Sequence, residues 1–289
     1  ERAIDLDEEY AEPYTGLADT YSMMAGYNFA KPHDAMPKAK SFAKLAIEKN
    51  PHFAGGYTSL AWIQHGYERE WNNAEQNYLK AIELNPNYAT GNQWFSIHLS
   101  QLAKHTEAIK FAVKATELDP ESMIIKLAAA QIFYFAGQNE MALQYCNEAS
   151  TIDPFFSTTM WLKYAKIYEI YAEEDIAHIK KAIRLFPAQP MNRKVLANVY
   201  LKQGNREAAL EQMVFLLEGY HDIMNKGHFA ESFFIMDMPN QGYRWLEKSI
   251  EANEGWALFY ANVPSLKKHQ QEPRFRELYK KINHPLFVD

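Results

Sequence analysis

Residues 74–88 read AEQNYLKAIELNPNY, and this stretch decides the fold of the chain. An Asn followed by Pro ends a helix, because proline disfavours helical geometry in its predecessor and cannot donate the next backbone hydrogen bond. The same pair, or Asp followed by Pro, recurs along the chain. The prolines in this ladder are Pro51, Pro86, Pro120, Pro154 and Pro187, separated by 35, 34, 34 and 33 residues, and the last of them follows Phe186 instead of Asn or Asp. Such near-constant spacing predicts a solenoid of repeated units.

Small residues recur at the same spacing as the prolines. An alanine stands five residues before each proline, at Ala46, Ala81, Ala115, Ala149 and Ala182. A small residue in every unit lets neighbouring helices approach closely. Each unit also carries two segments with apolar residues at three- and four-residue steps, joined by a turn such as residues 137–139, which indicates a helix pair. No alternating apolar-polar run bounded by hairpin turns occurs, so we expect an all-α protein.

The arrangement aromatic-x-x-Leu-Ala-x-x-Tyr, with the two alanines and Asp-Pro that follow, resembles the tetratricopeptide repeat. Its residues here include Tyr57, Leu60 and Ala61, and the resemblance covers nearly the whole chain. It implies an all-α, right-handed superhelical solenoid of antiparallel helix pairs. We expect about six to seven units over residues 1–253, the first truncated at the N-terminus, and a C-terminal capping segment over 254–289 with a helix at about 273–282. About nine extra residues around 28–37 predict a lengthened helix or loop.

Composition narrows the classes of partner. A net charge of −6 argues against the strongly basic face that direct binding of nucleic acid would need. No apolar run approaches the ~18 residues that a membrane-spanning helix needs. A single cysteine, Cys146, and the absence of any Asn-x-Ser/Thr site favour a reducing, cytoplasmic setting. The chain does not open with Met, so we interpret it as a piece of a longer protein.

Sites of catalysis and metal binding are not expected from this sequence. The nearest histidine pairs, His98/His105 and His221/His228, lie seven residues apart, or about 10.5 Å along a helix. That separation is too large for both rings to hold one zinc ion. The phosphate-loop, dinucleotide-binding, His-Glu-x-x-His and Gly-x-Ser-x-Gly motifs are all missing. We therefore predict no metal and no cofactor, and we interpret Cys146 as a buried apolar filler.

The concave surface offers the remaining candidate site, because the first helix of every unit lines it in this architecture. Aromatic side chains mixed with neutral hydrogen-bonding groups favour binding of a protein or peptide segment. Alternatively, Trp62, Tyr134 and Trp161 pack between adjacent units. The repeat register gives these candidate partner-binding residues: Thr58, Trp62, His65, Gln93, Gln131, Tyr134, Trp161, Tyr168, Lys194 and Asn198.

We therefore predict a non-catalytic scaffold that holds a protein or peptide in its groove. Lys194-x-x-x-Asn198 has the spacing with which some tetratricopeptide proteins grip a C-terminal carboxylate, although the next helices offer no matching cations. One alternative is a self-assembly module whose homo-oligomer aligns an upstream effector domain, and another is a fragment of an enzyme. The chain's ending also resembles the repeat arms of bacterial multidomain regulators, in which a winged-helix, nucleotide-cyclase or kinase domain precedes the repeats. This resemblance implies a recognition or regulatory arm.

Overall fold

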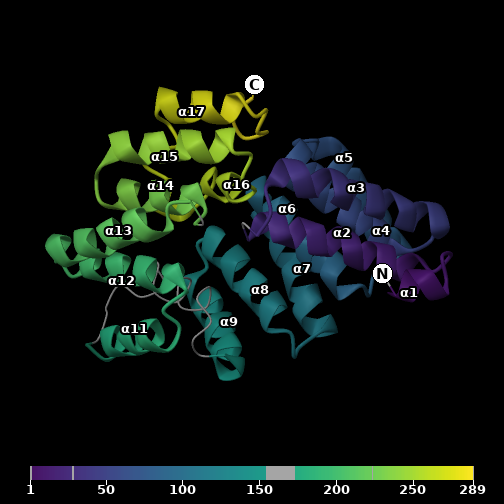
Figure 1. Ribbon diagram of the computed structural model, residues 1–289, viewed down its shortest axis with the longest axis horizontal. Helices are drawn as coiled ribbons and strands as arrows, with labels where there is room; N and C mark the ends of the chain where they lie inside the picture. Colours follow the sequence, from purple (N-terminus) through teal and green to yellow (C-terminus); the bar gives the residue numbers. More distant parts are fainter. Residues whose placement is uncertain (1, 28, 154–172, 223, 289) are drawn as a thin grey trace.

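The computed structural model describes residues 2–27, 29–153, 173–222 and 224–288. Within these ranges the chain forms helices and no strand, and consecutive helices pack in antiparallel pairs (Figure 1). The predicted all-α solenoid of helix pairs is confirmed. The first helices of the pairs are α2 (Ala11–Gly26), α4 (Ala54–Ile63), α6 (Ala89–Gln101), α8 (Met123–Phe135), α12 (Pro190–Lys202) and α14 (Lys226–Ile235). Their partners are, in the same order, α3 (Pro32–Lys49), α5 (Trp71–Leu84), α7 (His105–Leu118), α9 (Asn139–Ile152), α13 (Arg206–Tyr220) and α15 (Pro239–Glu251). One more helix, α11 (Glu173–Leu185), precedes α12.

Short elements complete the chain. The helix α1 (Arg2–Leu6) precedes the first pair, and a π-helix, η1 (Gln64–Glu68), continues α4. After α15 come α16 (Trp256–Tyr260), the 3₁₀ turn η3 (Pro264–Leu266) and α17 (Pro273–Lys280). No helix in the described ranges is both long and apolar enough to cross a membrane.

The Asx-Pro pairs end helices as the sequence predicts. Asn50, Asn85, Asp119 and Asp153 are the C-caps of α3, α5, α7 and α9. The side-chain oxygens of Asn50 and Asn85 each accept the backbone N–H two residues further on, at 3.0 Å. This Asx turn redirects the chain into the next pair, and proline stabilises it by fixing one backbone dihedral.

The turn inside five of the pairs passes through one left-handed residue. These residues are Arg69, Ala103, Gly137, Gly204 and Asp237, with φ between 56° and 76°. Glycine adopts this conformation without steric cost, which explains Gly137 and Gly204. Pro51 precedes its left-handed residue by 18 positions, whereas Pro86, Pro120 and Pro187 precede theirs by 17. The extra residue of this 35-residue unit is therefore absorbed in η1, since a π-helix adds one residue per turn.

The repeated alanines lie where helices meet. Ala46, Ala81, Ala115, Ala149 and Ala182 are all buried, as is Cys146 between two of them. The extra residues around 28–37 lengthen the second helix of the first pair. Pro32 occupies the first turn of α3, where its missing N–H costs nothing, and Pro37 lies inside the helix.

The C-terminal segment returns to the early pairs and closes the superhelix (Figure 1). The Oδ1 atom of Asn253 accepts a hydrogen bond from Nη2 of Arg69 at 2.7 Å, and its Nδ2 donates to the carbonyl of Tyr67 at 3.0 Å. Asn262 donates to the carbonyl of Ser100 at 3.0 Å. The rings of Trp71 and His284 lie 4.9 Å apart. The two ends of the array thus enclose a space between them.

Candidate functional site

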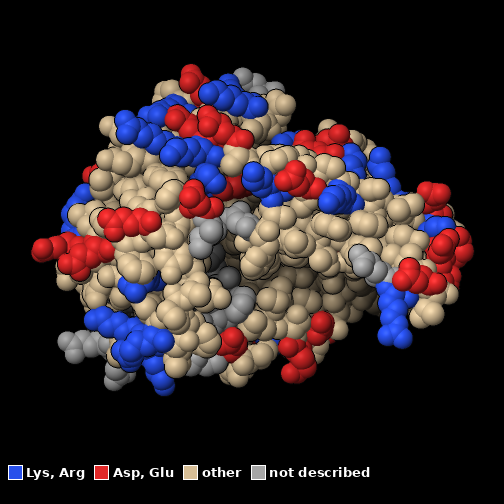
Figure 2. All heavy atoms as spheres, in the orientation of Figure 1, with Lys and Arg blue, Asp and Glu red and all other residues tan. Residues whose placement is uncertain are grey.

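A cavity of about 210 Å³ lies on the inner side of the superhelix. Its walls come from the C-terminal end of α2, the start of α3, the α4–η1 junction, α6, α8 and residues 253–259. The molecule is hollowed where these elements meet, and the surface around the hollow is mostly uncharged (Figure 2). The site therefore combines first helices from several pairs with the segment that closes the array.

Aromatic side chains from separate elements line this cavity. Trp62 of α4 and Trp94 of α6 have ring centroids 4.8 Å apart and are tilted by 36°. Trp256 and Phe259 of α16 lie 4.9 Å apart. Ring pairs at such separations present large, rigid apolar faces.

The described part of the lining is electrically neutral. Among the described residues that line the cavity there is no Asp, Glu, Lys or Arg. Burial lowers the pKa of His65 to about 4. Repulsion from the charge of Arg69 lowers this pKa further, whereas the hydrogen bond to Gln101 raises it. His65 is thus uncharged at neutral pH, and its Nε2 lies 2.5 Å from Oε1 of Gln101.

Two glutamine side chains add polar groups to the wall. The Nε2 atom of Gln93 reaches the carbonyl of Ile124 only at 3.5 Å, a weak hydrogen bond. The Nε2 atom of Gln131 is buried and has no hydrogen-bond partner. Because a buried unpaired donor is costly, Gln131 offers a group that an incoming acceptor would stabilise.

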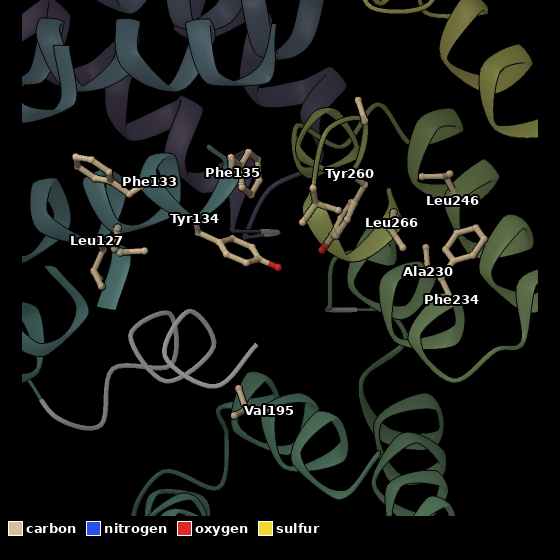
Figure 3. Close-up of a cluster of buried hydrophobic side chains, with 14 of the residues drawn as sticks. Leu127, Phe133, Tyr134, Phe135, Val195, Ala230, Phe234, Leu246, Tyr260 and Leu266 are labelled. Carbon is tan, nitrogen blue, oxygen red and sulfur yellow. The ribbon is translucent and has the colours of Figure 1, made fainter. Parts of the chain in front are cut away.

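Four of the ten candidate residues meet at this cavity: Trp62, His65, Gln93 and Gln131. Thr58 lies away from it and is buried; its hydroxyl donates to the carbonyl of Ala54 at 3.1 Å. Tyr134 belongs to a buried cluster with Tyr260 and Leu266 (Figure 3), which corresponds to the packing alternative. Trp161 and Tyr168 lie outside the described residues.

Lys194 and Asn198 are buried rather than displayed in the groove. The ammonium of Lys194 lies 2.5 Å from the carboxylate of Glu231, and both side chains are inaccessible to solvent. A carboxylate clamp needs a cation that faces the groove, and Lys194 is instead paired with an acid of the next unit. Neither residue lines the cavity.

The positions of the repeat did not predict several of the residues that line the cavity. Trp256 and Phe259 follow the last helix pair, so the repeat gives them no position on the concave side. Trp94 sits one residue after the predicted Gln93 and is largely buried. The aromatic-rich stretch of residues 256–260 is the one sequence signal that could have pointed to them.

A second buried polar group lies behind the cavity, where the C-terminal segment contacts η1. Arg69 donates to Asn253, but its Nε and Nη1 atoms are buried without a partner. Burial lowers the pKa of Arg69 to about 10 and that of nearby His284 to about 3. No set of three or more His, Cys, Asp or Glu side chains in the described ranges is arranged to hold a metal ion.

Comparisons with known proteins bear on the fold. No protein-family model matches the chain. The structure resembles that of a tetratricopeptide repeat protein from Parabacteroides merdae, with a TM-score of 0.58 and 12% identity over 94% of this chain and 99% of that one. The fold is that of a tetratricopeptide-repeat solenoid. PilW, a type IV pilus biogenesis factor, shares this tetratricopeptide-repeat fold with a TM-score of 0.57 and 18% identity over 74% of this chain and 96% of its own.

A sequence relative carries the same repeat. The human tetratricopeptide repeat protein 6 is 26% identical over 117 residues, which are 40% of this chain and 22% of that protein. The match thus spans about a fifth of the relative's length. It concerns the tetratricopeptide repeat and leaves the rest of that protein unmatched.

Proposed function

We propose that this chain is a non-catalytic scaffold that holds a segment of a partner protein on the inner side of its superhelix. The neutral aromatic cavity carries this proposal. Stacked helix pairs create extended concave surfaces that such proteins use for binding. Aromatic anchors with neutral hydrogen-bonding neighbours are the composition that dominates binding energy at protein interfaces.

The residues proposed to contact the partner are Trp62, His65, Gln93 and Gln131, because all four line the cavity. Trp62 is half-buried, so it has surface left to bury against a ligand. The amides of Gln93 and Gln131 would fix the partner's register through hydrogen bonds.

The test is selection from a displayed library of random peptides, followed by affinity measurements with purified protein. We expect enriched peptides to lose at least tenfold in affinity for Trp62→Ala and for Gln131→Ala. Val214→Ala, an exposed change on α13, is the matched control and should bind normally. Circular dichroism must show that the variants stay folded. A library that yields no specific peptide, or peptides indifferent to both cavity variants, would refute the proposal.

We further propose that this scaffold is the cytoplasmic recognition arm of a larger bacterial regulator. The resemblance of residues 254–289 to the ends of such arms supports it. In a full-length protein that joins an effector domain to these repeats, measuring the effector's activity with and without a selected peptide tests this role. An effector whose activity ignores the peptide would contradict it.

Self-assembly is a second candidate, favoured by apolar side chains exposed near the N-terminus. Leu6 and Phe29 are 82% and 80% exposed. Light scattering across a concentration series would reveal a dimer or larger oligomer, and Phe29→Ser should weaken it. A strict monomer at all concentrations excludes this candidate.

A further inference from the structure

The neutrality of the cavity restricts what can enter it, if the chain binds a partner segment as proposed above. A charged side chain entering this space would lose its hydration and find no opposite charge among the described lining residues. His65 cannot supply one, since its ring is buried and uncharged at neutral pH. The occupant is therefore an uncharged group.

Size restricts the occupant further. The cavity measures about 210 Å³, somewhat more than an engineered cavity of about 150 Å³ that binds benzene. Pockets for whole drug-sized molecules begin at about 300 Å³. One aromatic side chain fits this space, whereas two residues of a peptide do not.

The walls match an aromatic ring rather than a peptide backbone. Trp62, Trp94 and Trp256 come from three elements and offer ring faces for stacking or edge contacts. A peptide unit would bring one N–H and one C=O that both need partners. In the described lining, Nε2 of Gln131 and Nδ1 of His65 are buried without a hydrogen-bond partner. These two groups could pair with one peptide unit at most, and the volume is too small for two residues. The partner's backbone therefore stays at the mouth while one side chain enters.

The π-helix marks the same place. The extra residue of the 35-residue unit falls in η1, whose His65 and Gly66 form part of the wall. Single π-helical turns occur frequently at functional sites, because they change the direction in which side chains point. The extra residue lies beside the cavity. In the other described units that begin at one of the ladder prolines, the spacing to the left-handed residue is regular.

We propose that the cavity is a recognition pocket for one uncharged aromatic side chain, Trp or Phe, of the partner segment. This inference rests on the proposed scaffold function. It adds that one residue of the partner provides most of the specificity. It also implies that Lys or Glu at that position is rejected.

The first experiment uses a peptide selected on the wild-type protein and replaces each of its residues in turn. We expect one aromatic position at which Lys or Glu weakens binding at least tenfold, and free indole should compete with the peptide. A peptide that binds tightly but tolerates Lys or Glu at every position would overturn the pocket and leave the scaffold function intact. Failure to find any peptide would remove both.

The second experiment fills the pocket. Ala128 lines the cavity, so Ala128→Phe places a ring in the empty space and should weaken the peptide at least tenfold and abolish indole competition. Ala188→Phe, at an exposed turn, is the matched control and should bind as wild type. Gln131→Glu keeps the shape and adds a charge, so it should restore binding to a peptide whose anchor is Lys. Unchanged binding to Ala128→Phe, with its circular dichroism spectrum also unchanged, would overturn the proposal.

Discussion

The buried ion pair between Lys194 and Glu231 should control the stability of the later units. Its Nζ–Oε2 distance is 2.5 Å, and the exposed fractions of the two side chains are 0% and 2%. Glu231 otherwise accepts one hydrogen bond from Ser265, at 2.8 Å. Lys194→Met keeps most of the side-chain volume but leaves the carboxylate buried with a single donor. Breaking such a pair typically costs about 3–5 kcal/mol.

Two further variants separate charge from packing. The double variant Lys194→Met with Glu231→Gln leaves no buried charge at this pair, so it should recover most of the lost stability. Lys80→Met is the control, because Lys80 and Glu83 form an ion pair of 3.0 Å with side chains 42% and 70% exposed. Exposed pairs contribute about 0–1 kcal/mol, and this variant should unfold close to wild type.

The assay is urea unfolding followed by circular dichroism, with hydrogen exchange to locate the loosened helices. We expect Lys194→Met to lower the urea midpoint and to speed exchange in α12 and α14 first. If it unfolds at the same urea concentration as Lys80→Met, the carboxylate is not buried as described. A variant of full stability that loses affinity for peptides with a free C-terminus would instead support a groove-facing Lys194.

Two other outcomes follow from burial. Gly227→Ala should destabilise the chain by about 1–3 kcal/mol in urea unfolding. Its added methyl group would collide with the ring of Tyr260, which is buried and held by His228 at 2.6 Å, whereas Gly16→Ala has open space and should stabilise α2. Burial lowers the pKa of His284 to about 3. As the pH falls, this histidine therefore takes up its proton in the unfolded chain at a higher pH than in the folded protein. The stability from the neutral ring is complete above about pH 6.5 and falls as the pH drops toward 3, by up to about 1.4 kcal/mol per pH unit. His284→Asn should flatten this slope in urea midpoints measured across pH, and His33→Asn, exposed by 69%, should not; equal slopes for the two would contradict the assignment.

Local rules were enough to predict the helix ends. Asn85 combines an Asx turn with the proline after it, and both effects act within three residues, so the sequence alone predicts where α5 stops. The repeated alanines also allowed prediction of helix contacts, because these contacts lie within one unit or between adjacent units. The repeat spacing also located the unit that carries an extra residue, although the π-helix that absorbs it is a structural finding.

Contacts between distant units were beyond this reasoning. Lys194 occupies a groove position in the register, but its partner Glu231 lies 37 residues further on, in the next unit. A lysine in such a position is usually solvated, and its burial depends on an acid that the pattern does not reveal. Trp256 reaches the cavity because the array coils back on itself. This coiling depends on the sum of the rotations between successive units, which the repeat pattern does not specify.

The hydrogen bond between Arg69 and Asn253 joins residues 184 positions apart. In an open solenoid each unit touches its neighbours alone, so evolution can lengthen the array by duplicating a unit. Here an added unit of 34 residues would carry the C-terminal segment past Arg69 and leave the guanidinium without its acceptor. The number of units between Arg69 and Asn253 is therefore constrained by this contact, and relatives that keep it should vary in their loops and keep the repeat count between these two positions.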